Sequence, residues 1–505
     1  MAKSIRKSDV DMGELYHGYC SCRKRKRNTL QEQEFSFHIT TALPKLRNEL
    51  LTETYAPLPA RTFLITKPVL REIFAPDFKD RVDQHFVSEK LEPLFEKEFI
   101  YDCYSCRKGK GTLFGIKRLQ RFIAQCSANF TKDCYILLGD IKGYFMSIVR
   151  GNLWEKLKAF VEEKYHNNDK EKLLWQLHVF LFNSPLNNVV IRGNRKLWRE
   201  LPDNKSVFSC CGAPKPCDYD GEYTADMDVN KKGLTIGALP SQMLGNFYLS
   251  PFDHFCKSML RFYGRYVDDF YIVHESKEFL LNIVKVLKEF LKSMGLVLHP
   301  DKIRVLHYKQ GIPFLGAIIK GKALLPGKRI RGGFRRVLRD IDELPDYMKH
   351  THKIEDYVSR INSYLGMLKH FNARKYIRNM IERHPRVKFF FHIEEDLSKV
   401  TSIRKIMEKQ HQYAWKITMR RYHEQFRKRN KYKPFLSRKR LYDFVYFELY
   451  GIMPSLEHQK LKEEVPFLIT NRAFFVRRNK KRKSNGTSIL FQTGIDGFYG
   501  AAPPG

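Results

Sequence analysis

Two apolar stretches of the chain run into carboxylates. Tyr135–Gly139 is almost wholly apolar, which predicts a buried strand that ends at Asp140. Phe262–Val273 places aromatic and apolar residues on both sides of Asp268 and Asp269, which predicts two strand-like segments joined by a tight turn. The pattern therefore allows three carboxylates to converge at the ends of predicted strands.

A glycine-rich loop lies between these two stretches. This loop, Lys232–Gln242, leads into the apolar run Met243–Leu249, which is typical of a helix. Much further along, Leu441–Tyr450 spaces its apolar residues as a packed helix does. The chain has 505 residues and is 43% hydrophobic, so we expect three or four subdomains.

The adjacent carboxylates of Asp268 and Asp269 require something that relieves their repulsion. Two ionised carboxylates about 4 Å apart repel by roughly 4 kcal/mol at an effective dielectric near 20. Solvent at an exposed turn relieves this repulsion, and so does a divalent cation. Neighbouring side chains of an extended segment point to opposite faces, so we expect the Asp269 side chain to point away and rank Asp268 above it as a ligand.

The order of these features, a strand with Asp140, a glycine-rich loop and the Asp268-Asp269 turn, resembles the palm of reverse transcriptases, in particular prokaryotic enzymes of the non-LTR type. The resemblance covers about residues 35–385. It implies an α+β fold, a right-hand polymerase with fingers, a palm built on an antiparallel sheet, a helical thumb and a helical basic C-terminal extension. The expected divisions are a basic N-terminal segment at 1–34, fingers at 35–135, palm at 136–320, thumb at 321–385, and a basic RNA-binding extension and tail at 386–505. An insertion at about 195–231 is expected at the surface, because Ser209–Asn230 carries Gly, Pro and acidic residues.

The same resemblance implies a reaction, RNA-directed DNA synthesis by phosphoryl transfer with two Mg²⁺ ions, for which Mn²⁺ is a substitute. Carboxylate oxygens suit these hard ions. The implied catalytic and metal-binding residues are Asp140, Asp268 and Asp269. The residues implied to contact the deoxynucleoside triphosphate, or the template beside it, are Lys67, Arg71, Phe145, Gly237, Ser241, Gln242 and Lys302.

These nucleotide contacts have different implied roles. Lys67 and Arg71 would hold the triphosphate through charge-assisted hydrogen bonds, and Lys302 would donate a proton to the pyrophosphate leaving group. Phe145 would exclude a ribose 2′-hydroxyl and so favour a DNA product. Gly237 would allow close backbone approach. The ordinary alternatives are solvated cations and, for Phe145, a core aromatic.

Two further segments resemble parts of the family that touch nucleic acid. Tyr101–Thr112 is similar to a fingers segment rich in cations, and Pro313–Gly316 to the hairpin that supports the primer. The implied nucleic-acid contacts in these segments are Arg107, Lys108, Lys110, Phe314, Leu315 and Gly316.

The net charge independently indicates a polyanionic partner. Lys and Arg total 91 against 55 Asp and Glu, which gives a formal charge of +36. Cations cluster at Arg23–Arg27, Met419–Lys433 and Arg477–Lys483. Aromatic residues interleave with cations in the middle cluster, as they do where bases stack and phosphates pair, although a solvated helix face is the alternative. The nucleic-acid contacts expected there are Arg420, Arg421, Arg427, Lys428 and Arg429.

Within the family, the long basic extension favours a defence-associated reverse transcriptase, close to the enzymes of diversity-generating retroelements. This class implies a dedicated, structured non-coding RNA as template and scaffold, with cDNA made in antiphage defence. The alternatives are mutagenic cDNA synthesis for diversity generation, and a catalytically silent RNA-binding protein on a polymerase scaffold. Priming from a protein hydroxyl such as that of Tyr499 is a further alternative, against which an ordinary frayed terminus is favoured.

The sequence has neither an N-terminal signal pattern nor an apolar run of membrane length, so we expect a cytoplasmic protein without a membrane partner. The ten cysteines are then expected as reduced thiols. A zinc site at Cys103 and Cys106, or at Cys210, Cys211 and Cys217, is disfavoured because neither set has a clear second pair of ligands. A homo-oligomer around an RNA scaffold is compatible with the sequence, but no residue requires one.

Overall fold

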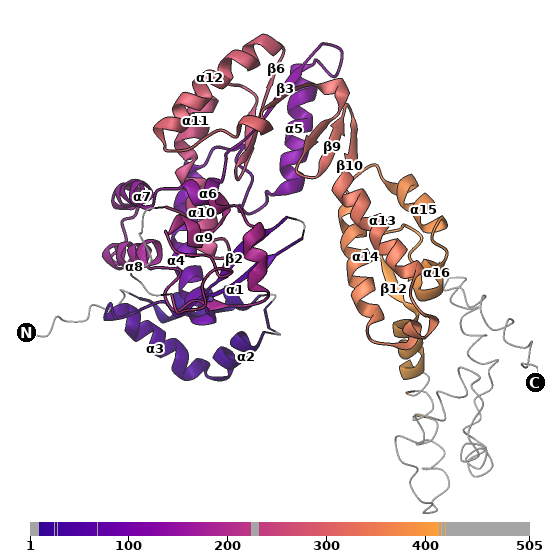
Figure 1. Cartoon of the computed structure of the whole chain (residues 1–505), viewed down its shortest axis with the longest axis horizontal. Helices are drawn as coiled ribbons and strands as arrows, with labels where there is room; N and C mark the ends of the chain where they lie inside the picture. The colour runs from indigo at the N-terminus through magenta and orange to yellow at the C-terminus, as the bar shows by residue number, and fades with distance from the viewer. Residues whose placement is uncertain are drawn as a thin grey trace, which may run out of the picture. The chain divides into compact units, whose positions relative to one another are not determined.

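A computed structural model describes residues 10–24, 26–27, 29–67, 69–223, 232–413, 416 and 420 of the chain (Figure 1). It divides into two compact units, Met1–Gly327 and Lys328–Gly505. The predicted α+β class is confirmed, because helices combine with antiparallel sheets. Of the basic cluster in the extension, Arg420 is described and is exposed, while Arg421, Arg427, Lys428 and Arg429 lie outside the described residues. Leu441–Tyr450 and Tyr499 also lie outside them.

The first unit begins with helices that pack together. Leu15 and Tyr19 of the first helix share a buried core with Val82 and Phe86 of the fourth. These helices are α1 (Met12–Arg23), α2 (Leu30–Phe37), α3 (Ile39–Leu51) and α4 (Phe78–Glu98). The helices that follow are α5 (Thr112–Cys126), α6 (Tyr144–Ser147), α7 (Arg150–Lys164), α8 (Lys170–Phe182), α9 (Val207–Cys210), α10 (Leu239–Tyr248), α11 (Ser250–Met259) and α12 (Lys277–Ser293).

A four-stranded antiparallel sheet positions the carboxylates. Its order is β5 (Tyr263–Tyr266), β6 (Asp269–His274), β3 (Tyr135–Asp140) and β7 (Arg304–His307). Helices α5 and α12 flank the sheet (Figure 1). Leu137 and Ile272 join the core that contains Leu287 of α12, whereas Tyr271 packs against Phe122 of α5 with ring centroids 6.2 Å apart. Because both faces of the sheet are covered, β3 is apolar from Tyr135 to Gly139 rather than at alternate positions.

Two smaller sheets complete this unit. In the first, β2 (Arg71–Ala75) pairs antiparallel with β1 (Arg61–Ile65), which also pairs in parallel with β4 (Val190–Ile191). The hairpin β1–β2 carries Lys67 in its connection and Arg71 at the start of its second strand. The second sheet has the order β10 (Ala323–Pro326), β9 (Ala317–Lys320), β8 (Ile312–Phe314).

In the part that the structure describes, the segment expected as a surface insertion contributes to a buried core. Trp198, Phe208 and Tyr223 are buried, and they form a core together with Phe74 of β2. Short helical turns at Arg195–Glu200 (η1) and Asp203–Lys205 (η2) precede α9 in this segment. Of the three buried aromatic residues, Tyr223 alone lies within Ser209–Asn230, where most of the described residues are exposed or half-buried.

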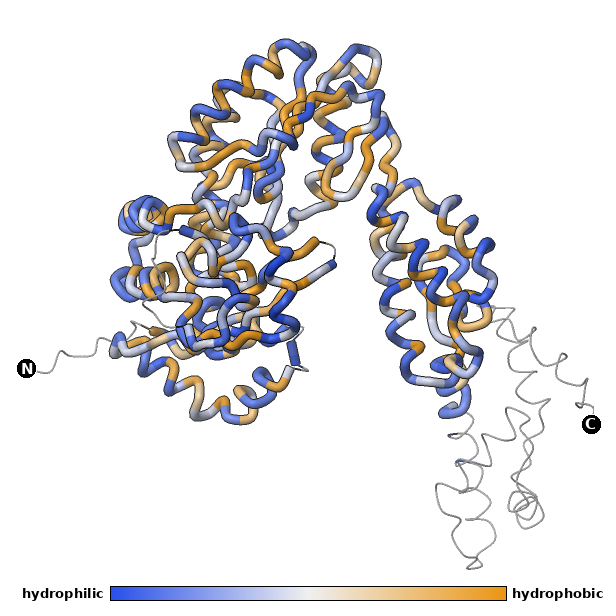
Figure 2. Tube along the Cα trace, in the orientation of Figure 1, coloured by the Kyte–Doolittle hydropathy of each residue, from blue (hydrophilic) through white to orange (hydrophobic). Residues whose placement is uncertain are grey.

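The second unit is helical over most of its described length. Its elements are α13 (Lys328–Asp342), α14 (Ile354–Leu368), α15 (Arg374–Glu382), α16 (Arg386–Phe390) and the pair β11 (Phe391–Ile393) and β12 (Val400–Ser402). Hydrophobic and hydrophilic positions alternate along these helices (Figure 2). Phe334, Ile361, Leu365 and Phe390 lie in their common core. No helix among the described residues of either unit combines the length and the apolar character that a membrane crossing needs.

Candidate active site

Three carboxylates converge where β3 meets the turn between β5 and β6. In the antiparallel register, Asp140 lies directly opposite Asp269. Asp268 occupies the turn itself, next to Val267, whose φ of 57° is left-handed. Each of the three aspartates offers an oxygen atom, and these oxygens lie within 4.8 Å of one another. Residues far apart in the sequence therefore form one acidic cluster, as the apolar pattern predicted.

The expectation that the Asp269 side chain points away from the cluster is wrong. Alternation of faces holds within a strand, but the backbone turns at Val267 and Asp268, so the two aspartates are not consecutive residues of one extended segment. Asp269 is the first residue of β6 and faces Asp140 across the ladder. All three carboxylates are thus available to a common ligand.

Burial and mutual repulsion disfavour the ionised forms of the paired aspartates. Burial, followed by the charge of Asp140, raises the pKa of Asp268. Burial and the charges of Asp268 and Asp140 raise the pKa of Asp269 to about 7. Lys302 offsets part of this charge, because its Nζ donates to Oδ2 of Asp140 at 2.7 Å. Burial works to lower the pKa of Lys302, but this hydrogen bond and the three negative charges raise it overall.

This donor set suits a divalent cation. Three carboxylates with few cationic neighbours form the oxygen-rich, negatively charged environment that Mg²⁺ or Mn²⁺ prefers. Among the residues that the structure describes, it is the single group of three or more His, Cys, Asp or Glu side chains close enough to hold an ion together.

A buried polar network lies beneath the turn, and sequence reasoning missed it. Arg265 and Asp253 form an ion pair in which neither side chain is exposed, with Nη2 and Oδ2 2.6 Å apart. Arg265 also donates from Nη1 to the Val267 carbonyl at 2.7 Å, and the Val267 N–H donates to Ser105 Oγ at 3.2 Å. Asn246 accepts from Ser105 Oγ at 2.8 Å. The network thus holds the left-handed residue that precedes Asp268. The available signal was an arginine inside an otherwise apolar strand, which must be paired if it is buried.

The nucleotide-contact candidates from the hairpin and the palm face different surroundings. Lys67 and Arg71 are exposed, and the positive charge of Arg71 lowers the pKa of Asp268, although less than burial raises it. Arg71 therefore lies near enough to the acidic cluster to act on it electrostatically. Phe145 is partly buried beside Tyr144, with ring centroids 5.5 Å apart.

Gly237 in the glycine-rich loop is required by the fold. Its φ is 130°, and a Cβ at this position would lie 2.2 Å from the carbonyl oxygen of Phe74 in β2. The neighbouring Ile236 carbonyl accepts a hydrogen bond from the Phe74 N–H at 2.8 Å. The close approach that this glycine permits in the structure is to strand β2.

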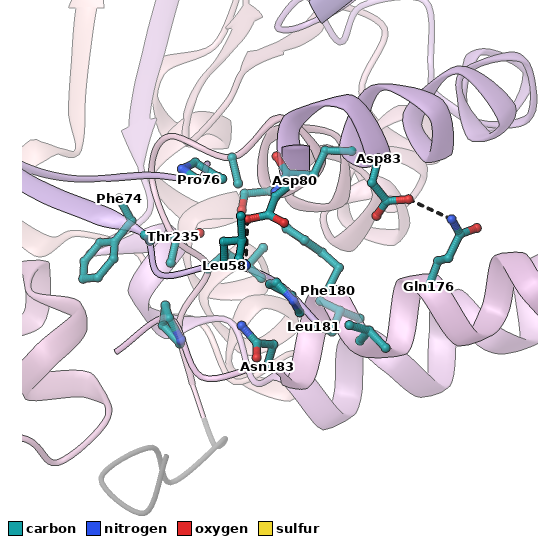
Figure 3. A pocket seen from close by; sticks show the side chains of 18 of the residues that line it. Leu58, Phe74, Pro76, Asp80, Asp83, Gln176, Phe180, Leu181, Asn183 and Thr235 are labelled. Atoms are coloured by element: carbon teal, nitrogen blue, oxygen red, sulfur yellow. Dashed lines mark hydrogen bonds between the residues drawn. The ribbon is translucent and has the colours of Figure 1, made fainter. Parts of the chain in front are cut away.

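Ser241 and Gln242 differ in exposure. Ser241 is buried and lines a cavity of about 80 Å³ together with Asp80, Asp83 and Phe180 (Figure 3). Its Oγ has no hydrogen-bond partner among the described residues. Gln242 is exposed and accepts a hydrogen bond from Cys106 Sγ at 3.1 Å. Of the two residues, Gln242 is the one whose side chain is exposed.

The cations of the fingers segment also separate into two kinds. The guanidinium of Arg107 donates to Glu96 and to the carbonyls of Ile100 and Cys103, and the side chain is 5% exposed. Arg107 therefore holds its own loop together, and its implied contact with nucleic acid stays a prediction. Lys108 is 84% exposed and can exchange its partner Glu92 for a phosphate. Lys110 donates to the Tyr101 carbonyl at 2.6 Å.

The hairpin implied to support the primer forms between β8 and β9. Leu315 and Gly316 are its turn, with φ values of 48° and 84°. Phe314 is buried, and its ring packs edge-on against Tyr271 with centroids 5.1 Å apart. The Phe314 side chain therefore belongs to the core of the protein, and the implied contacts of Phe314, Leu315 and Gly316 with nucleic acid stay predictions.

Comparison with known proteins identifies the family. Residues 66–319, half of the chain, match the family described as reverse transcriptase (RNA-dependent DNA polymerase). Protein YkfC of Escherichia coli (strain K12) is 24% identical over 318 residues, which cover 60% of this chain and 76% of YkfC. The matched residues contain all three aspartates, Lys302, strand β2 with the connection before it, and the glycine-rich loop.

Solved structures of telomerases show weaker similarity. The telomerase of Candida albicans in complex with a TWJ fragment of telomeric RNA has a TM-score of 0.39 at 13% identity, over 82% of this chain and 65% of that one. Apo telomerase of Candida tropicalis has a TM-score of 0.38 at 13% identity, over 68% of this chain and 64% of that one. This chain thus spans less than two thirds of either telomerase chain, and the assignment rests on the sequence match alone. The chain belongs to the reverse transcriptase (RNA-dependent DNA polymerase) family.

Proposed function

We propose that this protein copies a structured RNA into DNA by adding deoxynucleotides to the 3′-hydroxyl of a primer. The observation that supports this most strongly is the convergence of Asp140, Asp268 and Asp269, with Lys302 bonded to one of them, inside the segment that matches the family. The raised pKa values of Asp268 and Asp269 mean that their ionised forms reduce the stability of the folded protein. A relative that had lost catalysis would have no reason to keep three repelling carboxylates together.

Asp140, Asp268 and Asp269 would hold the divalent ions, Mg²⁺ in the first place and Mn²⁺ as a substitute. Bound ions of this kind would activate the primer hydroxyl and neutralise the charge that develops on the triphosphate. The carboxylates themselves fix where such ions can sit, because Asp140 and Asp269 are paired strand residues and the turn at Asp268 is held by the network beneath it. This rigidity is what phosphoryl transfer requires of a protein, since catalysis depends on positioning.

The cations around the cluster would handle the triphosphate. Lys302 is held at Asp140 and its raised pKa keeps it protonated, so it carries a proton that it can pass to the departing pyrophosphate. Lys67 and Arg71 are exposed on the hairpin and can bind phosphate oxygens through charge-assisted hydrogen bonds. Together these three cations would offset part of the negative charge of a nucleoside triphosphate.

Phe145 would select the sugar. It follows Asp140 by five positions, lies partly exposed, and contacts both Tyr144 and the position of Gly245. In this role the ring would pack under the sugar and exclude a 2′-hydroxyl. Phe145→Ala is expected to relax discrimination against ribonucleotides in a primer-extension assay, and unchanged discrimination would contradict the steric role.

The basic surfaces would hold the RNA and its copy. On α13 the exposed cations lie opposite the buried Phe334, Val337 and Leu338, and they are Lys328, Arg329, Arg331, Arg335, Arg336 and Arg339. Such a row can follow a phosphate backbone, so binding should weaken steeply with salt. The total charge of +36 is also what a protein that stays bound to a structured RNA would carry. We further propose that this RNA is a dedicated non-coding template and that its cDNA serves in antiphage defence.

The test is to isolate the nucleic acid bound to the protein when it is expressed with its native flanking DNA. RNA and DNA are sequenced for the wild type and for the Asp268→Ala variant. One abundant structured RNA with DNA copied from it, absent from the variant, is the expected result. Copies altered at adenines would instead indicate diversity generation, and RNA without any DNA would indicate a protein that binds RNA but does not copy it.

A further inference from the structure

Strand β2 carries Arg71 and Glu72 side by side, and their side chains lie on opposite faces. Arg71 is exposed, whereas Glu72 is 2% exposed. Arg71 acts on the pKa of Asp268, so its face of the strand belongs to the surroundings of the acidic cluster. Whatever holds Glu72 in place therefore also holds the strand backbone from which Arg71 extends.

Glu72 is held by one segment of the chain. Its Oε1 accepts from Trp198 Nε1 at 2.7 Å and from Ser206 Oγ at 3.1 Å, and its Oε2 accepts from the Val207 N–H. Burial raises the pKa of Glu72 to about 7, against these three hydrogen bonds, which lower it. A carboxylate is costly to bury without such partners, so the contact is a specific anchor.

The same segment also contacts the residues that follow Asp140. Gly143 is left-handed, with φ of 57°, and a Cβ there would lie 2.9 Å from the Asn204 carbonyl oxygen. Met146 shares a buried core with Trp198 and Phe208. The segment therefore touches Glu72, next to Arg71, on one side and the neighbours of Phe145 on the other.

Within the described part of the chain, strand β2 has one strand neighbour, β1. Beyond that pairing, its backbone bonds to the glycine-rich loop through Phe74 and Ile236. Phe74 packs against Phe208, with ring centroids 5.7 Å apart, on the same face as Glu72. The inner face of the hairpin is thus fixed by residues 195–211.

We propose that residues 195–211 form a brace that holds strand β2 to the palm, and that Glu72 is the positioning residue through which the brace places Arg71 on the triphosphate. The inference rests on the proposed function, because the triphosphate is its substrate. Glu72 touches neither substrate nor metal ligand in this arrangement. Its effect passes through the strand to the neighbouring arginine.

Two variants test the brace. Glu72→Gln keeps the shape of the side chain but replaces one acceptor oxygen by an NH₂ group, which opposes the donors on the brace. Trp198→Phe keeps a buried ring and removes the N–H donor. For each we expect KM for the deoxynucleoside triphosphate to rise about tenfold while kcat changes less than about twofold, since the loss is in substrate positioning. The matched control is Trp154→Phe, a partly buried tryptophan of α7 that packs on His178, and it should leave KM unchanged.

A double-variant cycle distinguishes positioning from general damage. If Glu72 acts through Arg71, then Glu72→Gln should raise KM little further in a protein that already carries Arg71→Gln. Full additivity of the two effects on KM would overturn the inference, and so would a fall in kcat at constant KM.

Hydrogen–deuterium exchange separates failure of the brace from failure of the proposed function. Amides of residues 61–75 should exchange faster in Glu72→Gln and Trp198→Phe than in the wild type and in Trp154→Phe. This readout needs no polymerase activity. A wild type that does not extend primers would therefore refute the proposed function, whereas exchange at the wild-type rate in both variants would refute the brace.

Discussion

Arg265 and Asp253 form an ion pair in which neither side chain is exposed. The Arg265 guanidinium also donates a hydrogen bond to the carbonyl of Val267, one residue before Asp268. The carboxylates that define the site are thus placed by a charged group of the protein interior. A buried ion pair of this kind adds little net stability, but removal of one partner leaves the other charge uncompensated.

Arg265→Met should therefore destabilise the protein by about 3–5 kcal/mol, and Asp253→Leu combined with it should recover part of that loss. Lys108→Ala is the control, because it breaks an exposed pair with Glu92 and should cost less than about 1 kcal/mol. Chemical denaturation of the three variants measures these differences. A single variant as stable as the control would contradict the role of the pair.

Lys302 should affect the chemical step more than nucleotide binding. The raised pKa of Lys302 keeps its ammonium group protonated beside the three aspartates. Lys302→Met removes this proton donor, so kcat should fall by about 10²-fold. Lys309→Met is the control, an exposed lysine whose Nζ lies 3.8 Å from Asp133. Single-turnover extension measures the chemical step directly. An unchanged rate in Lys302→Met would show that this lysine serves only to pair with Asp140.

Asp83 should make stability depend on pH. Burial and the charge of Asp80 raise its pKa to about 7, whereas Gln176 and Lys79 work to lower it. The pKa of Asp83 is higher in the folded protein than in the unfolded chain, where it is about 4. The stability that the folded state gains from protonated Asp83 is therefore fully present below about pH 4, and it is lost as the pH rises through the folded pKa.

Asp83→Asn should remove this dependence while keeping an acceptor for Gln176. The unfolding free energy of the variant relative to the wild type should then rise between about pH 5 and about pH 7, by at most about 1.4 kcal/mol per pH unit. Asp301→Asn, at a side chain that is 88% exposed, is the control and should show no such trend. A parallel pH dependence in wild type and Asp83→Asn would contradict the buried, protonated state.

Gly237 should not tolerate a side chain. Gly237→Ala would place a Cβ against the Phe74 carbonyl at a positive φ, and we expect a loss of stability of about 1–3 kcal/mol. Gly151→Ala is the control, because Gly151 is helical and no atom lies within 4 Å of the place that a Cβ would take, so the change should be neutral or slightly stabilising. Equal melting temperatures for the two variants would show that the loop can move away from β2.

The sequence predicted the central strands and the convergence of the three aspartates, because an apolar run and a turn leave clear periodic signals. It misplaced the Asp269 side chain, since the left-handed Val267 interrupts the alternation of faces. The partners of Arg107 and Phe314 could not be predicted for another reason. Which acid neutralises a cation and which ring fills a core depend on contacts between distant residues, and these leave no local pattern.

The supports of the site were also beyond the reach of the sequence. Arg265 and Asp253 are 12 positions apart, and Glu72 and Trp198 are separated by 126. Nothing in composition or spacing pairs such residues. Their burial becomes evident only when the strands and helices between them are in place.

The most direct test of the account is primer extension by the purified protein on an RNA template, with Mg²⁺ or Mn²⁺, beside the Asp268→Asn variant and the Asp301→Asn control. The account predicts incorporation of deoxynucleotides by the wild type and by the control, none after the divalent ions are chelated, and none by Asp268→Asn. Extension by Asp268→Asn at the wild-type rate would contradict the assignment of the three aspartates as the catalytic centre.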